Sequence, residues 1–369
     1  MENLDPSLFD HDHTLVNLSN AILSHYGITP FHAPLSEALS LFKGHRKIAF
    51  FLFDGLGESP LNRNKKAAKR FLSHAFGTIL SVNPATTVAA TTALLTAKFP
   101  LETGYLGWSL YFEELGYPLD VFPNKRSGTH EPAPIPNYMG HVCPTTKIDV
   151  LLREKGIKAK LLFPRSIETN GPKSPKEQFD AASSFFDEGG EFLYCYFPEP
   201  DHAMHEKGVA NRKVRKIIRN MGKMVSRFAK RHPDVLVLTL ADHGMVDTIL
   251  RDLSAYPSLK ECLYRPMTFE GRTANFFVKK EKKEEFEETF KRLFPSFFLI
   301  RKEEILEKGY FGEGEPSPRS LSFIGDYLAL SYENEVLIES DNKPVHLTKG
   351  HHAGITPEER KILLCAWNK

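Results

Sequence analysis

Short apolar runs alternate with segments of helical character along the chain. The clearest runs are KIAFFLF (47–53), KAKLLF (158–163), EFLYCYF (191–197), DVLVLTL (234–240) and KILLCAW (361–367). Runs that are continuously apolar, and not alternating, are typical of strands in a parallel sheet covered on both faces. TILSV (78–82) predicts a further strand, and residues 62–74 predict a helix. The order of elements predicts an α/β, doubly wound fold with a mostly parallel central sheet and helices on both faces.

Two regions depart from this pattern. Residues 118–144 contain six prolines and little periodicity. They predict a long irregular connection, either a lid or a plain surface loop. Residues 272–332 predict a small α+β subdomain. We therefore expect an N-terminal segment (1–45) packed on the core, a catalytic core (46–250 and 335–369) and an inserted α+β cap (251–334).

Composition and charge argue against several classes of protein. The 369 residues are 41% hydrophobic and 25% charged, which is ordinary for a soluble globular protein. The formal net charge of +2 gives no overall attraction to nucleic acid or membrane. No apolar run is long enough to span a bilayer, and the acidic N-terminus lacks the apolar stretch of a signal peptide. Four scattered cysteines without a CxxC pair predict a cytoplasmic protein without disulfides.

One basic segment needs an interpretation of its own. Residues 207–231 hold ten Lys or Arg, opposite an apolar helical face. The simplest interpretation is a solvated helix face, with a nucleic-acid role as the weaker alternative. We therefore expect neither a membrane nor a nucleic-acid polymer as a partner. The sequence leaves the oligomeric state open.

Acidic and histidine side chains follow three of the buried strands, and two histidines precede the last strand. They are Asp54, Asp201, His205, Asp242, His243, His351 and His352. The carboxyl ends of parallel strands share one edge of the sheet, where open α/β folds bind ligands. Asp201 and His205 are four residues apart, which places them on one face of a helix. Asp and His together suit zinc or manganese, and six such ligands suffice for two ions.

The ordered motifs resemble those of the alkaline phosphatase superfamily. The motifs are FDGLG, NPATTVAATTALLTAKFPLETG, FPEPDHAMH, ADHG and GHHAGITPEE, between residue 47 and the C-terminus. The branch they resemble is the nucleotide pyrophosphatase/phosphodiesterase-like enzymes, also called type I phosphodiesterases. The resemblance implies two zinc ions. One would be held by Asp201, His205 and His352, and the other by Asp54, Asp242, His243 and the nucleophile. His352 is preferred to His351 because it directly precedes the small residues Ala-Gly.

The same resemblance assigns the nucleophile to Thr87, by its spacing to LLTAKFP. A threonine hydroxyl is a poor nucleophile unless a metal or a base removes its proton. Thr87 also lies near the start of a predicted helix, where free N–H groups favour a phosphoryl oxygen. Thr86 is the adjacent rival, and chemistry alone does not separate the two. Thr91, Thr92 and Thr96 recur at helical spacing and are interpreted as packing residues.

One position departs from the family pattern. Where eukaryotic-type pyrophosphatases have an asparagine that contacts a phosphate oxygen, this chain has Trp108. Tryptophan donates a single N–H and offers a flat aromatic surface, which indicates a base-stacking role. Lys349, in TKGHH, is a candidate substitute cation, although an exposed lysine is the simpler interpretation.

The resemblance implies, as the leading hypothesis, a metal-dependent hydrolase that cleaves phosphodiester or phosphoanhydride bonds of nucleotides through a phospho-threonine. Its expected partner is a small-molecule nucleotide or other phosphodiester substrate. The cofactors would be two divalent ions, zinc first and manganese as the alternative. A second hypothesis is a phosphomonoesterase built from the same residues. A third is a catalytically idle nucleotide-binding protein, which the complete set of ligands argues against.

Overall fold

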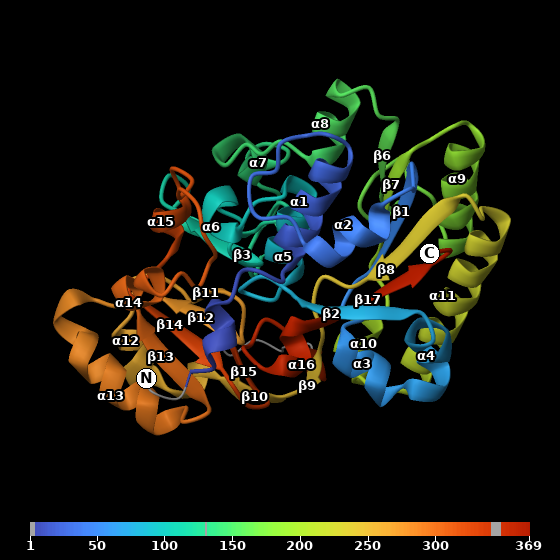
Figure 1. The fold of residues 1–369 in the computed structure, drawn as a ribbon. Coiled ribbons are helices and arrows are strands. Elements are labelled where there is room, and N and C mark those ends of the chain that lie inside the picture. Colours follow the sequence, from blue (N-terminus) through green and yellow to red (C-terminus); the bar gives the residue numbers. More distant parts are fainter. Residues whose placement is uncertain (1–3, 130, 341–347) are drawn as a thin grey trace.

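The computed structural model describes residues 4–129, 131–340 and 348–369, and it contains two large sheets (Figure 1). The first sheet has six strands, in the spatial order β2 (Ala75–Leu80), β17 (Lys361–Trp367), β8 (Val235–Leu240), β1 (Lys47–Phe53), β7 (Phe192–Phe197) and β6 (Ala159–Leu162). Strands β8, β1, β7 and β6 are parallel, whereas β17 is antiparallel to both of its neighbours. The mostly parallel α/β sheet predicted from the sequence is thus confirmed.

Helices cover both faces of this sheet. On one side lie α1 (Leu15–His25), α2 (Ser36–Phe42), α5 (Thr87–Thr96) and α8 (Ile148–Glu154); on the other lie α4 (Lys65–Leu72), α9 (Pro175–Asp187) and α11 (Arg212–Arg231). Successive side chains of β1 pack against the two helical layers in turn. Phe50 contacts Phe42 of α2, whereas Phe51 contacts Phe179 of α9 and Phe228 of α11. Burial on both faces explains why the strand is apolar at every position.

The second sheet is antiparallel and lies beside the first (Figure 1). Its seven strands are, in order, β13 (Phe297–Arg301), β14 (Tyr327–Ser331), β12 (Thr273–Phe276), β11 (Thr268–Phe269), β3 (Ser109–Phe112), β4 (Tyr117–Asp120) and β5 (Lys125–Arg126). Helix α13 (Lys283–Leu293) packs against this sheet through Phe286 and Phe290. The sheet combines strands from residues 268–331 with strands from residues 109–126. The boundaries proposed for the catalytic core and the cap stay predictions.

Shorter elements connect these layers. The helices are α3 (Glu58–Arg63), α6 (Pro100–Thr103), α7 (Tyr138–Val142), α10 (Asp201–Lys207), α12 (Pro257–Glu261), α14 (Lys302–Glu307), α15 (Ser320–Phe323) and α16 (Pro357–Arg360), with 3₁₀ turns at Pro6–Phe9, Leu253–Ala255 and Lys280–Lys282. Strand β10 (Ile249–Asp252) pairs with β15 (Glu335–Ile338), and β9 (Val246–Asp247) with β16 (Gly350–His351). Among the helices described, none has the length and hydrophobicity to cross a membrane. All four cysteines are free and buried.

Three local expectations differ from the structure. The single helix expected at 62–74 is two helices, α3 and α4, because the Asn64 side chain hydrogen-bonds the carbonyls of Pro60 and Val209 and the backbone turns there. The strand expected at 78–82 lies at Ala75–Leu80 and is a largely exposed edge strand. The segment 118–144 is more regular than expected, since it contains β4, β5 and α7.

Helix α5 lies between the two cores, and each of its ten residues is buried. Val88 packs in the core of the second sheet, whereas Ala89, Ala90 and Ala93 pack in the core of the first. Small residues are needed because both sides of the helix are in contact with protein. The interpretation of Thr91, Thr92 and Thr96 as packing residues agrees with their burial.

Candidate active site

Three adjacent parallel strands bring the predicted metal ligands to one edge of the sheet. Asp54 follows β1, Asp242 and His243 follow β8, and α10, which begins at Asp201 and includes His205, follows β7. The backbone N–H of Asp201 donates to the carbonyl of Asp54 over 3.1 Å, which ties two of these strand ends together. Gly55 makes this approach feasible. Its φ is +70°, and a Cβ there would lie 2.9 Å from Asp201 Oδ1.

The first group of candidate ligands is Asp54, Asp242 and His243. All three are buried, and one ligand atom from each lies within 4.8 Å of the others. His243 Nε2 is 3.3 Å from Asp54 Oδ1 and 3.5 Å from Asp242 Oδ2. Its Nδ1 is 2.9 Å from the carbonyl of Gly244, to which an Nδ1–H can donate. That tautomer leaves the Nε2 lone pair facing the two carboxylates.

The second group is Asp201, His243 and His352. The family resemblance places His205, and not His243, in this group. His205 lies beside it, with Nε2 3.3 Å from Asp201 Oδ2 and Nδ1 2.7 Å from the carbonyl of Gly350. The rings of His243 and His352 stack with their centroids 3.9 Å apart. The two groups therefore adjoin, and His243 belongs to both.

His351 and His352 have different surroundings. Both ring nitrogens of His351 face hydroxyls, with Nδ1 2.5 Å from Thr248 Oγ1 and Nε2 2.7 Å from Thr348 Oγ1. His352 Nδ1 is buried and has no hydrogen-bond partner within the described structure. The geometry thus favours His352 over His351 as the residue with a free lone pair.

The electrostatics of the site fit divalent cations. Burial, reinforced by Asp242 and Asp201, raises the pKa of Asp54 well above its usual value. Burial lowers the pKa of His352, and the neighbouring His243 adds to the effect. Two carboxylate oxygens, Asp201 Oδ1 and Asp242 Oδ2, are buried and lack hydrogen-bond partners in the part of the chain that is described. Unpartnered carboxylate oxygens and a neutral imidazole are the donor atoms that bound zinc or manganese would satisfy.

Burial opposes ionisation of both His205 and Asp201, but the attraction between them prevails. This attraction raises the pKa of His205 to about 9 and lowers the pKa of Asp201. Without metal, His205 is therefore protonated at neutral pH and occupies the position of a cation beside Asp201.

The two rival threonines at the start of α5 face different partners. Thr87 Oγ1 is 3.1 Å from His243 Nε2 and 3.3 Å from Asp54 Oδ1. The Thr86 hydroxyl instead donates to the carboxylate of Glu270. Thr87 is thus the threonine whose hydroxyl faces the ligand groups.

Sequence reasoning missed two residues at this site. The hydroxyl of Tyr196, on β7, donates to Asp54 Oδ2. Its place near the end of a strand that leads to two ligands is a signal that could have identified it. Glu270 accepts from the Thr86 hydroxyl and from the backbone N–H of Trp108, the latter over 3.1 Å. No pattern in the sequence marks Glu270, because both of its partners are distant along the chain.

The structure describes both candidate substrate contacts. The Trp108 side chain is partly exposed, while its backbone is fixed by Glu270 and by the N–H of Val121. The backbone N–H of Lys349 donates to the carbonyl of His205 over 2.6 Å, and its side chain is exposed. Their roles toward substrate stay predictions.

A buried ion pair positions the loop that carries His352. Arg272 and Glu359 both have fully buried side chains and are joined through Arg Nε and Nη2 over 2.6 and 2.8 Å. Glu359 also accepts from the N–H of Gly354 and the hydroxyl of Thr356, each over 2.7 Å. The pair thereby joins the second sheet to the segment that follows His352.

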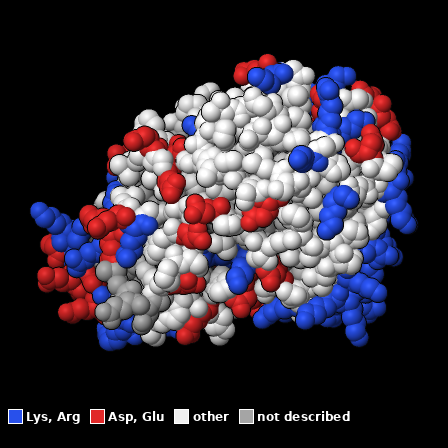
Figure 2. Space-filling view, viewed as in Figure 1, with Lys and Arg blue, Asp and Glu red and all other residues white. Residues whose placement is uncertain are grey.

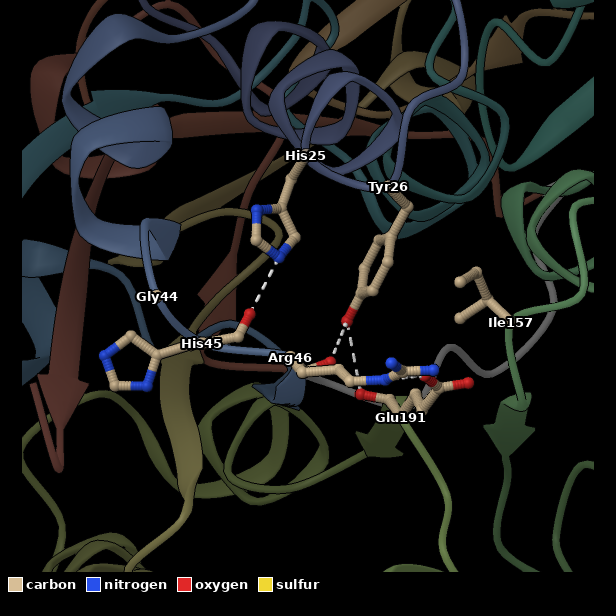
Figure 3. A pocket seen from close by; sticks show the side chains of 7 residues that line it. All are labelled: His25, Tyr26, Gly44, His45, Arg46, Ile157 and Glu191. Carbon is tan, nitrogen blue, oxygen red and sulfur yellow. Dashed lines mark hydrogen bonds and ion pairs between the residues drawn. The ribbon is translucent and has the colours of Figure 1, made fainter.

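A shallow cavity of about 450 Å³ lies elsewhere, at the opposite end of the strands (Figure 3). Arg46 and Glu191, which line it, directly precede β1 and β7. Its polar groups bond to one another: His25 Nε2 is 2.8 Å from the carbonyl of His45, and the Tyr26 hydroxyl donates to the carbonyls of Arg46 and Glu191. The candidate catalytic residues do not line this cavity.

Comparisons with solved structures agree with the fold. An inactive variant of murine ectonucleotide pyrophosphatase/phosphodiesterase 5, in complex with AMP, is 16% identical with a TM-score of 0.67, and the match covers 88% of each chain. The human protein of the same name is 15% identical, with a TM-score of 0.64 and 87% of each chain covered. Phosphonoacetate hydrolase from Sinorhizobium meliloti 1021, in complex with phosphonoformate, is 14% identical, with a TM-score of 0.65 and coverage of 87% of this chain and 90% of that one.

The family follows from the sequence match. No curated protein matches the chain. The family model described as type I phosphodiesterase/nucleotide pyrophosphatase, however, matches residues 48–354, which is most of the sequence. The chain therefore belongs to the type I phosphodiesterase/nucleotide pyrophosphatase family of the alkaline phosphatase superfamily, and it is a hydrolase of phosphodiester or phosphoanhydride bonds.

Proposed function

We propose that this enzyme hydrolyses nucleotide diesters or anhydrides through a phospho-threonine formed at Thr87, with two divalent ions, preferably zinc. Asp54, Asp242, His243 and Thr87 would hold one ion. Asp201, His205 and His352 would hold the other. The AMP bound to the murine relative supports a nucleotide as substrate.

The observation that carries the proposal is the position of the Thr87 hydroxyl. Its oxygen lies 3.1–3.3 Å from one atom each of His243 and Asp54, at the junction of the two ligand groups. The rival Thr86 already donates its hydroxyl to Glu270. A bound substrate phosphorus next to Thr87 would also face the free N–H groups at the start of α5, which favour phosphoryl oxygens.

The residues perform a double displacement. Thr87 Oγ loses its proton and attacks phosphorus, the bond to the leaving oxygen breaks, and that oxygen takes up a proton. The phosphoryl group, which still carries the nucleoside as an ester, is thereby transferred to Thr87. Water then attacks the same phosphorus and breaks its bond to Thr87 Oγ, which releases the nucleoside phosphate and, with a proton from the water, restores the hydroxyl. When bound, the metal ions would supply positive charge that lowers the pKa of the threonine hydroxyl and offsets the charge of the phosphoryl group. Tyr196 fixes the orientation of Asp54 through its hydrogen bond.

The test compares Thr87→Ala with Thr86→Ala as a matched control. We expect Thr87→Ala to abolish hydrolysis of bis-p-nitrophenyl phosphate and to leave the fold nearly unchanged, whereas Thr86→Ala retains turnover. Mass spectrometry of acid-quenched reactions should find the p-nitrophenyl phosphoryl group on residue 87. The reverse order of the two variants would move the nucleophile to Thr86.

The class of substrate can be determined by a hydrolysis screen in which the products of each candidate substrate are identified. Metal-loaded enzyme should be offered dinucleotides, cyclic dinucleotides, nucleoside triphosphates and simple monoesters. Diesters or anhydrides should be cleaved faster than monoesters. A preference for monoesters would replace the proposal by the phosphomonoesterase alternative.

A further inference from the structure

Two neighbouring helices, α4 and α11, present one extended basic face, which forms the large blue region at the lower right of Figure 2. All of its thirteen cations are exposed: Lys65, Lys66, Lys69, Arg70, Arg212, Lys213, Arg215, Lys216, Arg219, Lys223, Arg227, Lys230 and Arg231. Nine of these cations, on α11, belong to the basic segment already described from the sequence. The structure adds the four cations of α4, which are more than a hundred residues away along the chain. We call these thirteen residues the basic face.

Close packing makes the two helices a single surface. At Gly222 of α11, a Cβ would lie 3.2 Å from Arg70 Cβ and 3.3 Å from Phe71 Cε2 of α4. Glycine there lets the two helix backbones approach closely. The apolar residues of both helices are turned inward, with Phe71 of α4 and Val225 and Phe228 of α11 buried in the core. The outward sides of both helices are consequently left to the basic residues.

The charge of this face is largely uncompensated. Neither helix contains Asp or Glu. Among the residues that the structure describes, carboxylates lie within 4.0 Å of only two of the thirteen cations, Lys213 and Arg231. The chain has 48 Lys and Arg and 46 Asp and Glu, so outside the basic face 35 basic side chains stand against all 46 acidic ones. Such segregation creates a local positive field that the net charge of +2 conceals.

The arrangement of the cations fits a charged polymer. Arg215, Arg219, Lys223, Arg227 and Arg231 recur at every fourth residue, which is about every 6 Å along the helix. Positive charges spread over several turns of a helix suit a polymer with many phosphates better than a single phosphate group. A helix that binds a membrane surface would in addition insert apolar side chains. Here the exposed positions of both helices are all basic except Asn220.

The basic face also adjoins the elements that carry the candidate catalytic residues. Helix α10, with Asp201 and His205, leads directly into α11 and contacts it. Helices α3 and α4 follow the strand that ends next to Asp54. A strand bound along α11 would therefore extend toward the site.

We propose that the basic face binds the phosphate backbone of single-stranded nucleic acid. Single strands fit better than duplexes because Asp54 and Thr87 are buried, and an unpaired strand end is narrower than a duplex. The approach of that end to Thr87 rests on the proposed function, whereas binding to the basic face does not.

The experiment measures binding of a fluorescein-labelled single strand of about 20 nucleotides by anisotropy, over a range of salt concentrations. Arg215→Gln/Arg219→Gln/Arg227→Gln removes three cations of the basic face that have no carboxylate within 4.0 Å in the described parts of the chain. Lys155→Gln/Lys160→Gln/Lys176→Gln is the matched control, because it removes three exposed cations outside the basic face. Circular dichroism and turnover of bis-p-nitrophenyl phosphate verify that each variant is folded.

The basic-face variant should bind about tenfold more weakly or worse, and the slope of log affinity against log salt should fall by about 2, near 0.7 for each lost phosphate contact. The control should match the wild type. A charge reversal on both helices, Lys66→Glu/Arg219→Glu, should weaken binding further. Equal binding by all variants would overturn the proposal. So would weak oligonucleotide binding accompanied by strong, face-dependent binding to phosphatidylserine vesicles. Loss of hydrolysis in Thr87→Ala with unchanged oligonucleotide binding would separate the two proposals.

Discussion

Replacing Arg272 by methionine should destabilise the protein strongly, because it breaks a fully buried ion pair from one side. Arg272 donates two hydrogen bonds to Glu359 and one each to the carbonyls of Glu333 and Glu335, all over 2.6–2.8 Å. Methionine roughly replaces the volume but none of these bonds. The Glu359 carboxylate would stay buried with the N–H of Gly354 and the hydroxyl of Thr356 as its remaining partners.

The expected cost is about 3–5 kcal/mol, the usual result of leaving one charge of a buried pair uncompensated. Arg251 provides the control. It pairs with Glu335, but its side chain is about 29% exposed, so Arg251→Met should cost about 1 kcal/mol or less. Urea unfolding of the metal-free proteins, followed by circular dichroism, gives the difference from the midpoints when the slopes agree.

A double variant separates the pair from the volume change. Arg272→Met/Glu359→Met should cost less than the sum of the two single variants, with a coupling of about 2 kcal/mol or more. Affinity for metal should fall in Arg272→Met as well, because the pair positions the segment after His352. The reasoning would be refuted by equal effects of Arg272→Met and Arg251→Met, or by additivity in the double variant.

The remaining predictions concern the site. Burial lowers the pKa of His205, but Asp201 raises it to about 9, so the protonated ring competes with metal and the affinity for metal should rise with pH up to about 9. Titration calorimetry in buffers of different ionisation enthalpy should detect the release of a proton when metal binds. Metal binding without proton release would contradict the assignment of His205 as a ligand. In the metal-free protein the same shift stabilises the fold below pH 6.5, and this stabilisation should disappear as pH rises through about 9. Elemental analysis should find close to two equivalents of metal, and an active metal-free enzyme would end the two-ion proposal. Trp108→Ala should lower kcat/KM for a dinucleotide far more than for bis-p-nitrophenyl phosphate, since stacking contributes about 1–3 kcal/mol; equal losses would exclude a stacking role. Gly55→Ala should cost about 1–2 kcal/mol from its left-handed backbone alone and should weaken metal binding through Asp201, to be followed by unfolding and metal titration; unchanged metal affinity would contradict the contact.

Local patterns predict much of the sheet and its ligands. The run from Lys47 to Phe53 is apolar at nearly every position because both faces of β1 are covered, and Asp54 follows where the strand ends. Asp201 and Asp242 follow the same rule on β7 and β8. Since the carboxyl ends of neighbouring parallel strands meet, the convergence of these three carboxylates can be expected from the sequence alone.

Long-range partners could not be predicted in the same way. Asn64 interrupts a helical pattern because its side chain bonds to Val209, which belongs to a different part of the chain. Glu270 gives no local signal, and its importance arises only from its bonds to Thr86 and Trp108. Likewise, the sharing of His243 between two ligand groups depends on distances of a few ångströms that spacing along the chain does not determine.

The position of β17 has a consequence for biosynthesis. This strand, Lys361–Trp367, pairs with β8 on one side and β2 on the other, so it joins two strands made much earlier. Until the ribosome has released residues 361–367, β8 has an open edge and β2 has no partner in the sheet. The nascent chain therefore exposes an apolar strand edge until β17 is available to pair, and chaperones and aggregating chains bind such edges.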